Sequence, residues 1–360
     1  MKTSNAQQVA VIGAGIAGAT CARALTQAGH AVHVFDKSRG PGGRLATRRL
    51  EWVDRQGQAS TTRLDHGAVG FTARSEVFQT FADNALHAGW VALWSPVLAS
   101  GSLPLDGGPR LHVPVPDMPE LCRRLLDRGA VTWSYAVDGV HKSPLGWQVS
   151  TAGKRHGTLF DAVLLAVPPA QAAPLLSPYR RDWARRASVA PMQPCWTLMG
   201  VASEPEHEPV DAERWDVSRP PTGPLAWVMR NDARPGRARV PGQAHWVVHA
   251  RAGWSRRHLE QTPEWVQQQL QAALADCLGR PVDWHHRVVH RWRYALPLAQ
   301  RGASAEPCWW DASLGLGVCG DFFGGSGVED AWLSAQSLAR ALLQRAGDTA
   351  AYPEARRIVA

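Results

Sequence analysis

Three glycines near the start of the chain have the spacing of a phosphate-binding turn. Gly13, Gly15 and Gly18 follow the apolar run 9–12 in the pattern G-x-G-x-x-G. Glycine allows the tight turn and lets a pyrophosphate approach the backbone, and the helix that begins at Ile16 and Ala17 would offer it free N–H groups. The sequence therefore predicts a buried strand, a turn and a helix that bind a dinucleotide.

An acidic residue at the end of the next apolar run supports this prediction. Asp36 follows the run 31–35 at about the 20-residue distance expected for a carboxylate that binds a ribose hydroxyl, and we include its neighbour Lys37 in the same site. The alternative is a signal peptide, since Lys2 precedes the first apolar run. Glycines interrupt that run and no cleavage-type segment follows it, so dinucleotide binding is favoured.

Two further motifs point to one kind of dinucleotide. Residues 35–44 read Phe-Asp-Lys-Ser-Arg-Gly-Pro-Gly-Gly-Arg, and Thr-Arg-Arg and Asp-His-Gly-Ala-x-x-Phe-Thr-Ala-Arg follow. This order resembles the bacterial renalase-like flavoproteins of the amine-oxidase superfamily. The resemblance implies FAD as the tightly bound cofactor, with Gly43 and Arg44 in its site. Where the family usually has glutamine and an aromatic residue, this chain has Val69 and Gly70, so no substrate contact of that aromatic residue is transferred.

The loop at residues 66–68 belongs to the same resemblance. Gly67 would let the backbone approach the flavin ring, and Ala68 would lie beside it. His66 would either touch the flavin or fill a polar pocket, and the residue type alone does not decide between the two. The resemblance also implies that the strand containing Val137 passes the adenine end of FAD.

A second glycine-rich segment lies near the end of the chain. An apolar run at 314–319 leads to Gly320 and Asp321, then to Gly324 and Gly325, and a helix is expected from Val328 to about residue 343. The resemblance implies that Asp321 binds the ribityl or pyrophosphate part of FAD. The positive end of the helix at Val328 would stabilise the anionic reduced flavin.

The middle of the chain carries the candidate substrate residues. Two runs, 225–231 and 245–251, read as antiparallel strands, and alternation places Trp227 and Asn231 on a face that Arg230 does not share. Both runs resemble renalase segments that line the substrate side of the flavin, although an ordinary amphipathic sheet is the alternative. The candidate substrate-binding residues are Trp227, Arg230, Asn231, His249, Arg251 and Trp292, and the candidate phosphate ligands are Arg230, Arg251 and Arg293.

Two other groups of residues carry less chemistry. His285, His286 and His290 resemble a metal cluster, but in a strand His286 and His290 would be about 13 Å apart and His285 would face the other way. We therefore predict no metal. Six widely spaced cysteines without a C-x-x-C motif read as free thiols of a reducing compartment, which favours a cytoplasmic location.

Length and charge limit the possible domain number, fold and partners of the protein. At 360 residues two domains are expected, and no apolar run is long enough to cross a bilayer. The net charge of +8 comes from scattered arginines, which favours small phosphate-bearing partners over nucleic acid. We expect an α/β fold, with a Rossmann-type FAD-binding domain like those of p-hydroxybenzoate hydroxylase and the amine oxidases and a substrate domain on an antiparallel sheet. The expected FAD-binding domain is 1–70, 108–168 and 296–345, the substrate domain 71–107 and 169–295, and the tail 346–360.

The resemblance implies an activity. The chain would transfer hydride from 2- or 6-dihydro isomers of NAD(P)H to flavin N5, regenerate NAD(P)+ and reduce O2 to H2O2. Such a donor is electron-rich and needs no general base. The first alternative is an amine oxidase; many of these place a lysine near N5, but Lys2, Lys37, Lys142 and Lys154 lie outside the expected substrate sheet. The second is a flavin-binding redox protein without catalysis. The oligomeric state is left open.

Overall fold

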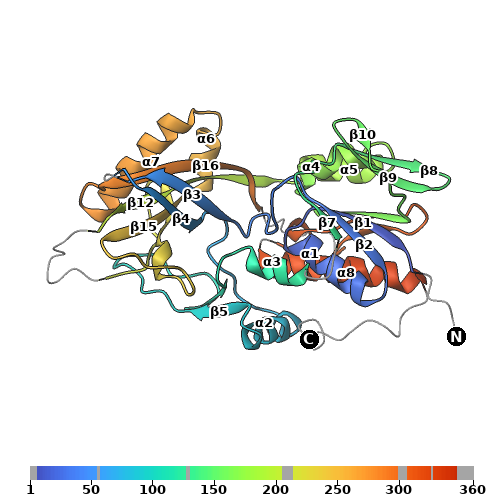
Figure 1. Ribbon diagram of the computed structural model, residues 1–360, viewed down its shortest axis with the longest axis horizontal. Coiled ribbons are helices and arrows are strands. Elements are labelled where there is room, and N and C mark those ends of the chain that lie inside the picture. Colours follow the sequence, from blue (N-terminus) through green and yellow to red (C-terminus); the bar gives the residue numbers. More distant parts are fainter. Residues whose placement is uncertain are drawn as a thin grey trace.

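Two lobes, each built on its own sheet, make up the molecule (Figure 1). The computed structural model describes residues 6–54, 57–126, 130–204, 214–298, 306–325 and 327–346. Apart from Ala346, the expected tail lies outside the described residues, as does Lys2. Within the described residues, no helix is long and apolar enough to cross a membrane.

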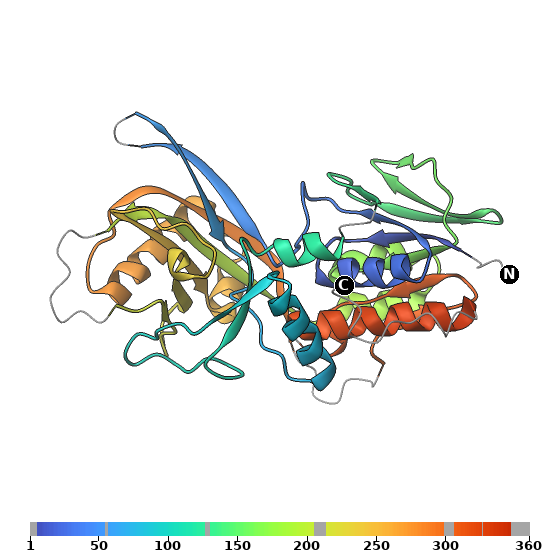
Figure 2. The same ribbon diagram turned by 60° about the horizontal axis from the view of Figure 1, so that its bottom comes forward.

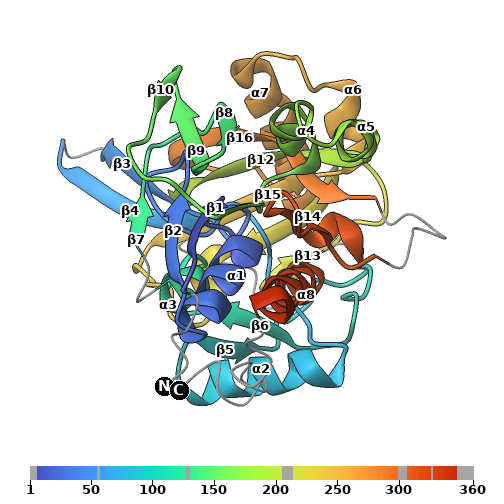
Figure 3. The ribbon, with the colours of Figure 1, turned by 90° about the vertical axis from the view of Figure 1, so that its right-hand side faces the viewer.

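The first lobe contains a six-stranded sheet in the order β17-β18-β11-β1-β2-β7. Its strands are β1 (Gln8–Ile12), β2 (Ala31–Phe35), β7 (Ala130–Thr132), β11 (Ala162–Leu165), β18 (Leu316–Val318) and the antiparallel edge strand β17 (Trp309–Asp311). The central β1 is buried on both faces, as its continuous apolar run predicts. Val9 and Val11 pack toward α1 (Ile16–Gln27) and α8 (Val328–Ala346), which lie side by side (Figure 3).

The second lobe contains a five-stranded antiparallel sheet in the order β13-β14-β15-β12-β16. Its strands are β13 (Val217–Ser218), β14 (Leu225–Arg230), β15 (Gln243–Ala250), β12 (Met192–Ser203) and β16 (Trp284–Pro297). One face packs on α7 (Pro263–Leu278), which begins at the Thr262 cap and ends at Gly279 with φ 65°. The helix α6 (Ala252–Arg257) lies before it.

Smaller elements complete the two lobes. They are the hairpin β3 (Thr47–Val53) and β4 (Ala59–Asp65), helix α2 (Glu76–His87), the pair β5 (Val91–Trp94) and β6 (Leu111–Pro114), helix α3 (Glu120–Leu125), and β8 (Gly139–Ser143), β9 (Gly146–Thr151) and β10 (Lys154–Arg155). The resemblance implied a strand containing Val137, but Val137 lies in the segment between β7 and β8.

The packing of two segments differs from the expected boundaries between the FAD-binding and substrate domains at residues 70 and 169. Helices α4 (Pro169–Leu176) and α5 (Arg181–Val189) pack on the parallel sheet, on the face of Ala10 and Ile12. The β3–β4 hairpin instead lies along the antiparallel lobe, where Trp52 stacks on His286 (Figure 2, blue hairpin). An apolar stripe shows that an element is covered but not by which sheet, so these contacts had no signal in the sequence.

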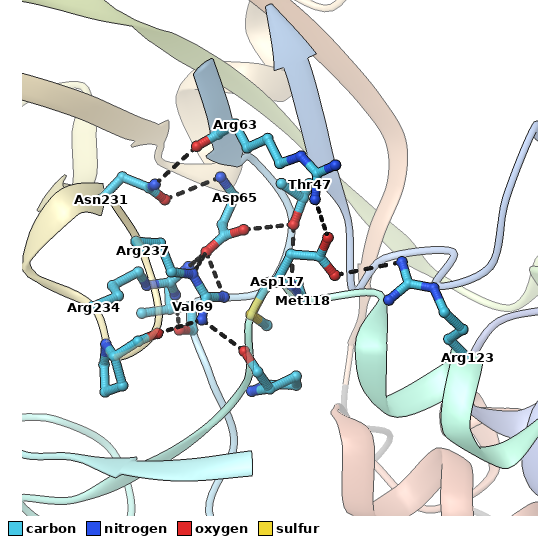
Figure 4. A network of polar contacts seen from close by, with 12 residues as sticks. Thr47, Arg63, Asp65, Val69, Asp117, Met118, Arg123, Asn231, Arg234 and Arg237 are labelled. Carbon is cyan, nitrogen blue, oxygen red and sulfur yellow. Dashed lines mark hydrogen bonds and ion pairs between the residues drawn. The ribbon is translucent and has the colours of Figure 1, made fainter. Parts of the chain in front are cut away.

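A buried ionic cluster holds the hairpin to the antiparallel lobe (Figure 4). The Asp65 carboxylate lies 2.7 Å from both Arg234 and Arg237, and Thr47 donates a hydrogen bond to it at 2.5 Å. Asn231 accepts from the Asp65 backbone N–H at 3.0 Å. Burial by itself raises the pKa of Asp65, but the two guanidinium groups and the Thr47 hydrogen bond outweigh it, so that the net pKa is lowered.

We expect Asp65→Asn to destabilise the folded protein by about 3 kcal/mol, because it leaves two buried guanidinium groups without their counterion. The free energy of unfolding in urea, measured on the FAD-loaded protein, checks this. Folding lowers the pKa of Asp65, so the ionised carboxylate stabilises the folded protein. This stabilisation is fully present above the pKa of Asp65 in the unfolded chain, about 4, and is lost as the pH falls below that value toward the folded pKa. Glu51→Gln, in an exposed pair with Arg49, is the control and should leave the unfolding curve unchanged. Equal curves for both variants would contradict the assignment.

Candidate active site

The predicted glycine turn has the geometry of a phosphate cradle. Gly13 has φ 109°, and a Cβ there would lie 2.5 Å from the Ala166 carbonyl oxygen, while a Cβ on Gly18 would lie 1.8 Å from that of Gly13. Gly15 caps α1 without a side-chain hydrogen bond, and a Cβ there would meet no atom closer than 3.9 Å. Gly13 and Gly18 are thus required by packing, whereas Gly15 faces open space beside the first N–H groups of the helix.

A second glycine loop lies against the first. The Gly42 N–H donates to the Ala14 carbonyl at 2.9 Å, and Gly15 and Gly42 form an isolated bridge. The Asp36 carboxylate accepts from the N–H groups of Ala14 at 2.6 Å and Ser38 at 2.7 Å, so it is fixed beside the turn. Lys37 is exposed next to it. This arrangement matches the place that a ribose-binding carboxylate requires.

Arg44 connects the two ends of the sequence. Its guanidinium donates two hydrogen bonds to the Asp321 carboxylate, both at 2.7 Å, and a third to the Ala295 carbonyl oxygen in β16 at 3.1 Å. Asp321 begins η2 (Asp321–Phe323), directly after β18. The sequence placed Arg44 and Asp321 in one cofactor site but did not predict that they pair, because 277 residues separate them.

The 66–68 loop also contacts Arg44, through the Arg44 backbone. The Ala68 N–H donates to the Arg44 carbonyl oxygen at 2.9 Å, and a Cβ on Gly67 would lie 2.0 Å from that oxygen. Only glycine therefore allows this close approach. The free helix N–H groups, the open side of Gly15, the carboxylate of Asp36 and the start of α8 at Val328 fit an FAD molecule, and these are the residues that would hold it.

A row of aromatic and imidazole side chains crosses the antiparallel sheet next to this loop. In the strand register Trp227 lies opposite His249, His249 opposite Thr197, and Thr197 opposite His290. Directly opposite residues of antiparallel strands share a face, so the four side chains form one row across β14, β15, β12 and β16. We call this row the histidine wall.

His66 and Trp292 complete the histidine wall. Their rings stack with centroids 5.1 Å apart, and the Trp292 indole N–H donates to the His66 carbonyl oxygen at 3.0 Å. The His66 ring also meets that of His290 edge to face at 4.9 Å. The structure thus brings Trp227, His249, Trp292 and His66 together, and it links the predicted flavin loop to the predicted substrate sheet.

The imidazoles of the wall are neutral at physiological pH. Burial, followed by the neighbouring His290 and Arg48, lowers the pKa of His66 to about 3. Burial and then Arg234 lower the pKa of His249 to about 4, and burial and then Arg48 lower the pKa of His290 to about 4. His66 Nδ1 and His249 Nε2 are buried and have no hydrogen-bond partner among the described residues. The protein therefore leaves two polar atoms of the wall without a hydrogen bond.

Two candidate residues have other roles. Arg230 lies opposite Trp246 on the α7 side of the sheet, and its guanidinium pairs with Asp232 at 2.9 Å and Glu204 at 3.0 Å. Arg251 follows β15 instead of extending it, and its side chain donates to the Gly223 carbonyl oxygen at 3.0 Å. These contacts correct the expectation that Arg230 and Arg251 face the substrate.

Asn231 and Arg293 are likewise engaged by the protein. Asn231 lies in η1 (Asn231–Ala233), beyond the end of β14, and binds the backbone of β4 through both its amide atoms. Arg293 pairs with Glu260 at 2.6 Å. Because these partners lie far away in the sequence, strand alternation alone could not reveal them. Arg48 is the charged residue near the wall that the sequence analysis missed, although it belongs to the Thr-Arg-Arg motif.

Comparison with known proteins agrees with this geometry. An NAD(P)-binding Rossmann-like domain matches residues 11–85, and the flavin containing amine oxidoreductases match residues 71–343. The family match and the shared fold define an FAD-dependent oxidoreductase, which confirms the predicted fold class, cofactor and enzyme class. More particularly, the chain belongs to the flavin containing amine oxidoreductase family.

Solved structures share the fold at low sequence identity. A putative protoporphyrinogen oxidase from Exiguobacterium sp. 255-15 has a TM-score of 0.70 at 12% identity, covering 95% of this chain and 100% of that one. Cyclohexylamine oxidase from Brevibacterium oxydans IH-35A has a TM-score of 0.62 at 13% identity, covering 94% and 99%.

A curated protein with a similar sequence is a bifunctional one. The tRNA 5-methylaminomethyl-2-thiouridine biosynthesis bifunctional protein MnmC of Magnetococcus marinus is 30% identical over 206 residues, which cover 47% of this chain and 30% of that protein. The chain thus spans less than a third of the length of this relative.

We expect Arg44→Ala and Asp321→Asn each to weaken FAD binding by about tenfold or more, because each leaves the other group unpaired at the cofactor site. The ratio of flavin to protein absorbance and the dissociation constant of FAD measure this. The double variant should be little worse than either single variant, since both remove the same interaction. Arg63→Ala, whose pair with Asp117 lies outside the glycine loops, is the control. Full flavin occupancy in Arg44→Ala would contradict the site.

Proposed function

We propose that this enzyme is an oxidase of the 2- or 6-dihydro isomers of NAD(P)H, which it returns to NAD(P)+ while O2 becomes H2O2. The observation that carries the proposal is the histidine wall, a largely half-buried surface of neutral rings beside the loop that would hold the flavin. The proposed substrate contacts are Trp227, His249 and Trp292, with His66 between substrate and cofactor. The proposed cofactor contacts are those of the glycine loops, Asp36, Arg44 and Asp321.

The wall suits a planar, electron-rich donor. When bound, FAD supplies a two-electron acceptor, so that donor, O2 and one proton give NAD(P)+ and H2O2. A dihydronicotinamide loses hydride without losing a proton, so the chain needs no base at this place. The indoles of Trp227 and Trp292 offer flat apolar faces, and His66 Nδ1 and His249 Nε2 offer hydrogen bonds to a carboxamide. The role of the residues is to position the donor and to exclude water.

Amine oxidation is the second candidate, because the family match is to flavin containing amine oxidoreductases. Two features of the chain favour the dihydronicotinamide instead. The described lysines lie elsewhere: Lys37 follows β2, Lys142 lies in β8 and Lys154 in β10. The positive charge of Arg48 acts on His66 and His290, and it would disfavour a cationic amine at the wall.

We expect the bound flavin to be bleached by 2- or 6-dihydro NAD(P)H more than about tenfold faster than by ordinary 4-dihydro NAD(P)H or by any of a panel of primary and secondary amines. Anaerobic stopped-flow mixing, followed at the flavin absorbance, measures these rates. Faster bleaching by an amine would replace the proposal with amine oxidation. No bleaching by any reductant would favour a redox protein without catalysis.

We expect the rate constant of flavin reduction to be constant between about pH 5.5 and 8, because an ordinary imidazole titrates there whereas those of the wall do not. His66, His249 and His290 become charged only as pH falls toward about 4 or below. Stopped-flow reduction across this range, with FAD occupancy checked at each pH, is the measurement. An inflection near pH 6.5 that disappears in His249→Asn would show that a wall histidine titrates normally and would contradict this picture.

A further inference from the structure

Arg48 extends from the face of β3 that is turned toward the histidine wall. In the hairpin register Arg48, Leu50 and Trp52 lie opposite Leu64, Thr62 and Ser60, so these alternate residues of β3 share one face. Leu50 and Trp52 are buried on that face, whereas Arg48 is exposed. The neighbouring Arg49 lies on the opposite face and pairs with Glu51 at 2.9 Å.

Two contacts fix how β3 runs along β16. Trp52 stacks on His286 with ring centroids 5.9 Å apart. Arg44, just before β3, donates to the Ala295 carbonyl near the end of β16. The two strands are therefore antiparallel, and the start of β3 lies beside the end of β16.

This direction places Arg48 near the histidine wall. Arg48 precedes Trp52 by four residues and His290 follows His286 by four, each about 13 Å along its strand. The charge of Arg48 accordingly reaches His66, His286 and His290. In each of these, burial is the first cause of a lowered pKa, and Arg48 lowers it further.

Arg48 differs from the arginines that were the candidate phosphate ligands, because no carboxylate among the described residues pairs with it. Arg230, Arg234, Arg237 and Arg293 form ion pairs with carboxylates, and Arg251 binds backbone carbonyl oxygens. Among the residues that the structure describes, none forms a hydrogen bond or ion pair with Arg48. An exposed guanidinium at the edge of a half-buried aromatic surface is suited to bind an anionic group of a ligand whose ring lies on that surface.

We propose that Arg48 binds a phosphate group of the dihydronicotinamide donor and thereby selects phosphate-bearing donors over uncharged ones. The inference rests on the proposed function, whose donor carries a nicotinamide ring for the wall and a pyrophosphate at a distance from it. Arg48 thus takes the role of phosphate ligand that the sequence suggested for Arg230, Arg251 and Arg293. Those three side chains are bound by other groups of the protein.

The experiment compares two donors on the FAD-loaded enzyme. One is a 6-dihydro NAD(P)H, and the other is the matching 6-dihydronicotinamide riboside, which has the same ring and no phosphate. Arg48→Ala should lower kcat/KM for the dinucleotide by about tenfold or more, mainly through KM, and leave the riboside unchanged. Arg48→Lys should recover part of the loss. In addition, the dissociation constant of the product NAD(P)+, measured by quenching of tryptophan fluorescence, should rise in Arg48→Ala.

Arg49→Ala is the matched control, because it removes the same charge from the neighbouring position on the outer face. It should behave as the parent enzyme with both donors. Equal effects of the two substitutions, or an equal loss for dinucleotide and riboside in Arg48→Ala, would overturn the inference. Failure of the proposed function has a different signature, since neither donor would then reduce the flavin of the parent enzyme. Unchanged FAD absorbance of each variant shows that it is folded and loaded.

Discussion

The pairing of Arg44 with Asp321 is the constraint on which the arrangement of the site depends. The guanidinium of Arg44, at the end of the second glycine loop, binds Asp321 beyond the last parallel strand and the backbone of β16. Asp321 is buried and Arg44 is partly exposed, so the pair is only partly desolvated and its two parallel hydrogen bonds offset the cost of burying the carboxylate. Through it, the nucleotide turns and the end of β16 keep a fixed relation, while the hydrogen bond from Trp292 to the His66 carbonyl oxygen holds the flavin loop beside the wall.

The electrostatics of the wall follow from what surrounds it. Behind His249 lies the Asp65 cluster, in which one carboxylate faces two guanidinium groups and leaves a net positive charge in a buried place. At the opposite end, Arg48 contributes a further positive charge. A charged imidazole between them would be both desolvated and repelled, so the histidines stay neutral. A surface of neutral rings inside a positive field attracts an anionic ligand with an aromatic or planar end and repels a cation.

Much of the fold follows from local patterns. The spacing of Gly13, Gly15 and Gly18 and the apolar run of β1 each specify their own element, and the structure contains these elements where they were predicted. What sequence alone could not give is the partner of each side chain. The alternation of β14 correctly separates Trp227 from Arg230, but the carboxylates that bind Arg230 come from outside the strand. The same holds for α4 and α5, whose apolar faces fit either sheet.

This difference explains why arginine was the least predictable residue of the site. A glycine or an apolar residue acts through the local backbone or through periodicity, both of which are visible in the sequence. A guanidinium acts through whichever carboxylate or phosphate lies within reach, and that depends on tertiary contacts. Arg44, Arg48 and Arg230 cannot be told apart by residue type. Arg44 joins the two halves of the cofactor site, Arg230 is bound by carboxylates of the protein, and Arg48 faces solvent beside the wall. In a family whose members share a fold, the positions of such uncompensated charges are where substrate preference can change without altering the rest of the structure.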